Sequence, residues 1–275
     1  MPTYEFDRAT PVTVALRMQR GVADVTAEDR PGIQVDLSPL DDNDPSRDSA
    51  GNFKVTLEGD TLLIQEPDGF GWPLRRSPKI HAVVRVPAGS SLAAKLASGD
   101  LRAKGDYGIV QTDLSSGDTY IERTTGDAEV KSASGEVQID KVGGSLRVGS
   151  ASGDVHVGDV TNDVSISTAS GDLTLRTVGG SIEGKSASGD ITVGRLRQGR
   201  AQFTTASGDV TVGVAAGTGV WLDLNAASGS TTSDLTMNQD ATQADQSAHL
   251  ELRARTASGD IHIHRALGDV ERETV

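Results

Sequence analysis

The chain has no cysteine, few aromatic residues and no long apolar run. The absence of cysteine excludes disulfides, thiolate metal sites and cysteine nucleophiles. Because only 3% of the 275 residues are aromatic, the core must be built from aliphatic side chains. No apolar run approaches the roughly 18 residues that cross a bilayer as a helix, and residues 1–21 lack the segments of a secretory signal. We therefore expect a soluble protein of the cytoplasm.

Basic residues are scarce as well. The sequence holds 26 Lys and Arg against 39 Asp and Glu, which gives a formal net charge of −13 and a pI near 4.8. A nucleic-acid-binding surface needs clustered positive charge to displace counterions from phosphates, and an anionic membrane surface attracts basic segments for the same reason. The composition argues against nucleic acids and membranes as partners.

What the chain does have is glycine at a fixed period. Glycine recurs every eighteen residues through the middle of the sequence, usually as Ser-Gly-Asp, and once more after nineteen. A second glycine-like position falls midway, so the unit is nine residues and two units make one repeat. A short fixed period is typical of a solenoid, in which similar coils stack on one another. We expect the recurring glycines to be structural turn residues: Gly99, Gly117, Gly135, Gly153, Gly171, Gly189 and Gly208.

Within each unit, apolar residues stand two and four positions after the glycine. Two apolar residues separated by a polar one predict a short strand with one buried face. Position seven alternates between larger aliphatic residues and alanine, which indicates a second inward position. Strands of successive coils would lie parallel, about 4.8 Å apart. The fold class predicted is all-β, a parallel β-solenoid with 18-residue coils, and right-handed winding is favoured.

The period sets the expected domain boundaries. After Gly208 the spacing loosens to twenty-one and thirty residues, at Gly229 and Gly259, which we interpret as insertions in corners, with residues 257–263 closing the last coil. Before about residue 87 alternation persists without the strict period. We therefore predict an irregular β cap at 1–90 that is continuous with the solenoid, solenoid repeats at 91–267, and a charged tail at 268–275.

Three segments carry a resemblance to a known group: VRVPAGSSLAAKLASGDL at 84–101, the preceding strand pair LEGDTLLI at 57–64, and the serial SASGDV-type units. With them the chain resembles bacterial domains of unknown function with β-strand repeats, often labelled putative adhesins. The resemblance covers nearly the whole chain and implies a single-stranded β-helix.

Stacked acidic residues and two histidines are candidate metal ligands. Carboxylates about 4.8 Å apart repel one another, and calcium would relieve that repulsion. Calcium-binding nonapeptide loops contain several glycines each, whereas every corner here has one glycine and one acid, so we interpret the acids as turn caps. His262 and His264 alternate with isoleucines and are expected on the surface. No metal or cofactor is predicted. The stacked acids are Asp100, Asp118, Glu136, Asp154, Asp172, Asp190 and Asp209.

One loop gathers aromatic and basic residues in a chain poor in both. Phe70, Trp72, Arg75 and Arg76 form a possible partner-binding loop, because aromatic and arginine side chains dominate binding energy at interfaces. The alternative interpretation is that the rings plug an open end of the solenoid.

The outward residues of the repeats contain no cluster of catalytic type. We therefore predict a non-catalytic interaction or scaffold module that presents a rigid polar surface to a protein partner. Two alternatives stay open: a structural protein that stacks end to end into filaments, as bactofilin-like rods do, and a protein that binds or acts on polysaccharide. The outward residues considered are Arg102, Tyr120, Gln138, His156, Thr174 and Thr192.

Overall fold

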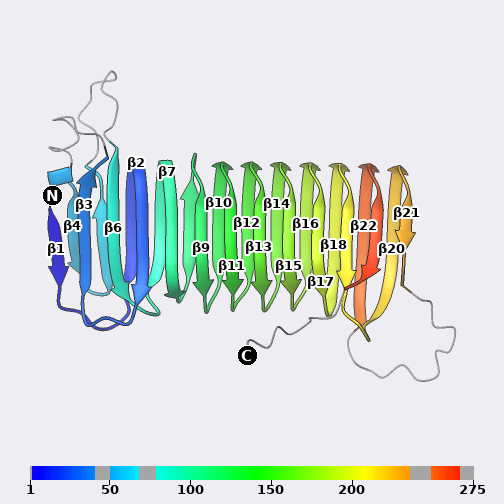
Figure 1. Ribbon diagram of the computed structural model, residues 1–275, viewed down its shortest axis with the longest axis horizontal. Coiled ribbons are helices and arrows are strands. Elements are labelled where there is room, and N and C mark those ends of the chain that lie inside the picture. Colours follow the sequence, from blue (N-terminus) through cyan, green and yellow to red (C-terminus); the bar gives the residue numbers. More distant parts are fainter. Residues whose placement is uncertain (1, 41–49, 68–78, 236–248, 267–275) are drawn as a thin grey trace, which may run out of the picture. The chain divides into compact units, whose positions relative to one another are not determined.

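The computed structural model of the chain describes residues 2–40, 50–67, 79–235 and 249–266, and its regular structure is almost entirely β-strand (Figure 1). Most strands run parallel to their neighbours in short coils, so the predicted all-β parallel solenoid is confirmed. The chain forms two compact units, Met1–Gly153 and Asp154–Val275, which are described in turn as unit 1 and unit 2.

Unit 1 combines parallel coils with antiparallel strands at one end. The long strands β2 and β7 each supply both sides of a coil, and each pairs in parallel with the other. Strands β8, β10 and β12 continue one side, while β9 and β11 continue the other. The strands are β1 (Thr3–Phe6), β2 (Thr13–Glu28), β3 (Ile33–Pro39), β4 (Lys54–Glu58), β5 (Thr61–Gln65), β6 (Ile80–Pro87), β7 (Ser91–Tyr107), β8 (Val110–Leu114), β9 (Thr119–Thr124), β10 (Ala128–Ser134), β11 (Val137–Val142) and β12 (Leu146–Ser152).

The N-terminal end of unit 1 is closed by antiparallel pairing. Strand β3 pairs antiparallel with both β1 and β6, and β4 pairs antiparallel with β5. Strands β5 and β6 pair in parallel with β2, which therefore lies between them and β7. Coil geometry thus begins with β2, inside the segment that the sequence assigns to an irregular cap.

Unit 2 consists of regular coils. One sheet contains β13 (Val155–Val160), β15 (Leu173–Val178), β17 (Ile191–Leu196), β19 (Val210–Val214), β23 (Ile261–Arg265) and β21 (Thr231–Ser233) in that spatial order. The other contains β14 (Val164–Ser170), β16 (Ile182–Ser188), β18 (Gly199–Ser207), β22 (His249–Ser258) and β20 (Gly219–Ser228).

The last coils of unit 2 do not follow sequence order. Strand β22 lies between β18 and β20 (Figure 1). Strand β23 lies between β19 and β21. The expectation that residues 257–263 close the last coil is therefore wrong, since β20 and β21 form the outermost described coil. The inward positions explain this order: β23 has Ile261 and Ile263 where β21 has Thr231 and Ser233, and the polar pair suits the coil exposed to water.

The core is built from the predicted aliphatic columns. Residues two and four positions after the glycine are buried in both units; Val157, for example, is 4% exposed. Position seven behaves differently in the two half-coils. Val142, Val160, Val178 and Leu196 are buried, but the alanines are exposed and the hydroxyl residue before each of them is buried instead. The expectation of inward alanines is wrong. The buried hydroxyls belong to Ser132, Ser150, Thr168, Ser186 and Thr205.

The two threonine hydroxyls of this set reach backbone acceptors in the corner before the glycine. Thr168 Oγ1 donates to the carbonyl of Ser170 at 3.1 Å, and Thr205 Oγ1 donates to that of Ser207 at the same distance. A methyl group would leave those carbonyls without that donor. At these two positions the corner therefore favours a hydroxyl side chain over alanine, whereas among the described residues the buried Oγ atoms of Ser132, Ser150 and Ser186 have no hydrogen-bond partner.

The turn glycines meet two constraints at once. Their φ angles lie between +120° and +156°, where side chains are strained. Successive corners also approach closely: a Cβ on Gly135 would lie 2.1 Å from the carbonyl oxygen of Gly117 in the preceding coil. Either constraint alone disfavours a larger residue, and together they account for the eighteen-residue period.

Candidate functional site

Three neighbouring strands of unit 2 gather arginine and tryptophan on one outer surface. Along β18, burial of Ala201 and Phe203 turns Gln202 and Thr204 outward. In β22 and β20 the same alternation turns Arg253, Arg255 and Trp221 outward. The parallel register places Gln202 beside Arg253 and Thr204 beside Arg255. We call this surface the tryptophan–arginine patch: Arg200, Gln202, Thr204, Trp221, Arg253 and Arg255.

Trp221 and Arg253 form the centre of the patch. The guanidinium carbon of Arg253 lies 5.4 Å from the centroid of the Trp221 ring, within the range of a cation–π interaction. Trp221 remains 53% exposed, one of only three large hydrophobic side chains exposed in the described part of the chain. Because Arg253 already restricts the exposed indole, a partner that binds this apolar surface pays little additional side-chain entropy.

Two carboxylates order the arginines. Glu251 Oε1 accepts from Arg253 at 2.7 Å, and Glu251 Oε2 accepts from Arg200 at 3.0 Å. Asp223 Oδ2 lies 3.7 Å from Arg255 and 4.0 Å from Arg253. The patch thus contains three guanidinium groups against two carboxylates, in a chain whose net charge is −13. The side chain of Arg255 is 65% exposed, so its guanidinium remains accessible to an acidic group.

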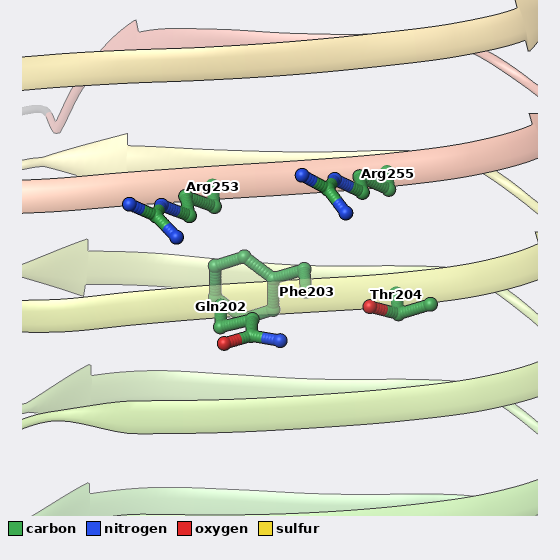
Figure 2. Close-up of a pocket in the computed structure, with 5 residues that line it drawn as sticks. All are labelled: Gln202, Phe203, Thr204, Arg253 and Arg255. Carbon is green, nitrogen blue, oxygen red and sulfur yellow. The ribbon is translucent and has the colours of Figure 1, made fainter.

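A shallow pocket opens within the patch. It has a volume of about 70 Å³ and is lined by Gln202, Phe203, Thr204, Arg253 and Arg255 (Figure 2). Sites that enclose small molecules usually measure about 300–1,000 Å³. The pocket can accept one side chain or functional group of a larger partner rather than surround a whole ligand.

The stacked acids are turn caps. The aspartates of this column accept the backbone N–H of the acidic residue one coil further on, as between Asp172 Oδ1 and Asp190 N at 2.8 Å. The same bond recurs from Asp118 to Asp100 at 3.2 Å and from Asp209 to Asp190 at 2.8 Å. At the end of the column, hydrogen bonds from the N–H and hydroxyl of Ser230 lower the pKa of Asp260. The amide dipoles offset the repulsion between neighbouring carboxylates.

The other predicted site residues do not assemble into a centre. Phe70, Trp72, Arg75 and Arg76 lie outside the described residues. The rings of His262 and His264 stack with centroids 5.5 Å apart, and His262 Nδ1 lies 2.9 Å from Thr232 Oγ1. Among the residues that the structure describes, no three His, Asp or Glu side chains are placed to hold a metal ion. No helix in that same part of the chain is long and apolar enough to cross a membrane.

Sequence reasoning missed the tryptophan–arginine patch because its members are far apart in the chain. Trp221 and Arg253 come together through a coil order that differs from sequence order. One signal was available: the alternation Val220-Trp221-Leu222 places the indole opposite the aliphatic face, which makes it an outward tryptophan.

A family model described as Toastrack DUF4097 matches residues 24–264. The chain belongs to this family. The predicted resemblance to bacterial β-repeat domains of unknown function is thereby confirmed, and the patch lies within the Toastrack match. No curated protein matches this Toastrack chain.

Solved structures with a similar fold carry binding or adhesion names. One is a putative lipid binding protein from Parabacteroides distasonis ATCC 8503, with 14% identity and a TM-score of 0.52, covering 95% of this chain and 96% of that one. Another is a putative adhesin from Bacteroides fragilis NCTC 9343, with 11% identity and a TM-score of 0.46, at the same coverage of both chains. At 14% identity, the likeness of the Toastrack chain to the first of these structures concerns the fold alone.

Proposed function

We propose that this chain is a non-catalytic interaction module whose rigid coils present the tryptophan–arginine patch to a protein partner. The observation that carries this proposal is the exposed Trp221 ring held by Arg253 beside the accessible Arg255. Tryptophan and arginine are the residues most enriched at the energetic centres of protein interfaces. The partner surface that fits this chemistry combines an apolar or aromatic group with a carboxylate.

Stability does not account for the patch. Exposed ion pairs contribute roughly 0.2–1 kcal/mol each, and an indole that stays half in water gains little from folding. The five residues that line the pocket also include no carboxylate or histidine that could act as a general base. Partner contact is the role that remains for this combination of side chains.

The test is affinity capture with the full chain. We compare the unmodified chain, a Trp221→Ala/Arg255→Glu double variant, and Arg147→Glu, which reverses one exposed charge in unit 1. The double variant should lose roughly 30-fold or more in affinity for the captured protein, since hot-spot truncations cost about 2 kcal/mol or more. Arg147→Glu should retain the affinity, and circular dichroism should show all three chains folded.

Two results would contradict the proposal. Equal capture of the same protein by the double variant would remove the patch from the interface. Specific binding of acidic oligosaccharides, lost in Trp221→Ala while no protein is captured, would favour the polysaccharide-binding alternative.

A further inference from the structure

The outermost coil of unit 2 leaves strand edges without a described neighbour. Strand β20 pairs with β22 on one side, and β21 pairs with β23. In the described part of the chain, no strand pairs with the other side of either. An unpaired edge presents backbone donors and acceptors that can pair with another strand.

The inward positions of β20 and β21, the two strands of this coil, differ in polarity. In β21 the inward positions hold Thr231 and Ser233, which are exposed and polar. In β20 the inward positions hold Val220, Leu222 and Leu224, which are only half-buried. Their counterparts one coil further in, Leu250, Leu252 and Ala254, are at most 1% exposed. The β21 half is thus suited to solvent, whereas the β20 half ends an apolar column that none of the described residues covers.

Strand β20 also lacks the usual protection of an edge. Natural edge strands carry lysine, proline or a bulge, or are very short. Strand β20 runs for ten residues, and residues 219–233 contain no Lys, Arg or Pro. Their one charge, Asp223, lies 3.7 and 4.0 Å from two arginines of its own chain. The edge therefore has no electrostatic barrier to a second strand, even though the whole chain is acidic.

We propose that β20 pairs antiparallel with β20 of a second copy and forms a two-fold dimer. Two copies of the strand are complementary, because the inward residues that would face one another across the two-fold axis of the dimer are apolar. With the axis at Leu224, Leu222 lies opposite Ala226 of the second copy and Asp223 lies opposite Asn225, so the two carboxylates do not face each other. This interface goes beyond the proposed contact with a partner protein.

A closed dimer fits the ends of the chain better than a filament. A filament needs two different complementary ends, whereas a two-fold interface uses one surface twice. The N-terminal end of unit 1 is closed by antiparallel strands, and its edge strand β4 carries Lys54 and Glu58, paired at 3.6 Å. Strand β4 thus carries a charge at each of its ends, which disfavours it as a partner for β20.

Sedimentation velocity over a micromolar concentration series tests the proposal. The unmodified chain should sediment as a dimer at the upper end of the series. Leu222→Lys places a charge on the uncovered apolar column and should leave a folded monomer. Thr192→Lys adds the same charge at an exposed position of β17 and should leave the dimer intact. A monomer at every concentration, a dimer in Leu222→Lys, or long polymers would each overturn the proposal.

A single-cysteine experiment covers the case in which Leu222→Lys fails to fold. Because the chain has no cysteine of its own, Leu224→Cys can form a disulfide only with another copy. Mild oxidation should convert Leu224→Cys to a covalent dimer at a rate at least tenfold above that of Thr192→Cys. Equal rates for the two variants would overturn the pairing.

Discussion

At the scale of single residues, the repeating glycine is fixed by contact between coils as much as by its own backbone. Gly135 has a φ of +120° and also lies against the carbonyl of Gly117. Gly149, in the same unit, has no neighbour within 4 Å of where its Cβ would be and no positive φ. The corner therefore requires glycine at position 135, whereas nothing in the described part of the structure requires it at position 149.

We predict that Gly135→Ala destabilises unit 1 strongly and Gly149→Ala does not. Strained backbone costs roughly 1–3 kcal/mol by itself, and the 2.1 Å approach must add to that through displacement of the neighbouring coil. Urea unfolding followed by circular dichroism measures the difference. Equal losses of unfolding free energy in the two variants would show that the corner does not require glycine.

At the scale of the strand, the sequence pattern predicts which residues of each repeat face the core. It fails where the chain turns, since Thr168 is buried and Ala169 is exposed. Hydrophobicity ranks alanine above threonine, but the corner supplies a backbone carbonyl, that of Ser170, to which the Thr168 hydroxyl donates. A pattern of apolar residues does not report such hydrogen bonds to the main chain.

Glu66 follows directly after strand β5, and its partial burial disfavours the ionised form of its carboxyl group. Glu66 accepts the backbone N–H of Gln19 at 2.5 Å, yet desolvation outweighs this bond and raises the pKa of Glu66 above 4.5. A raised pKa in the folded state means that protonation of Glu66 favours folding. Its ionised form therefore lowers stability as pH rises through the folded pKa.

Glu66→Gln should accordingly raise the melting temperature at pH 7, because the amide keeps an acceptor for Gln19 and carries no charge. The advantage should shrink as pH falls and disappear below about 4.5, where the carboxyl is protonated in both folded and unfolded chains. Glu5→Gln removes an exposed carboxylate and is the control. A lower melting temperature for Glu66→Gln at pH 7 than for the unmodified chain would contradict this assignment.

At the scale of the molecule, coil order departs from sequence order near both ends of the chain. In unit 1, β2 lies between the later strands β5 and β6 and the still later β7. In unit 2, β22 lies between β18 and β20. The period predicts how each coil is built, but coils with the same Ala-Ser-Gly corner fit equally well at several levels. Their order is set by which coil tolerates water, as Thr231 and Ser233 do in β21.

The candidate site depends on that order. Arg253 contacts Trp221 because β22 pairs with β20. Arg253 is also in register with Gln202 of β18, and both residues line the pocket. Local sequence predicts that each of these side chains faces outward. It cannot predict that they share a surface, since more than thirty residues separate Trp221 from Arg253.

Disulfide trapping of two cysteine pairs tests this coil order most directly. Neighbouring parallel strands lie about 4.8 Å apart, within the roughly 4.4–6.8 Å that a disulfide spans, whereas strands two coils apart do not. Because the chain contains no cysteine, Thr211→Cys with His262→Cys should form an intramolecular disulfide, and Thr211→Cys with Thr232→Cys should not. A disulfide in the second pair but not the first would contradict the stacking described for unit 2.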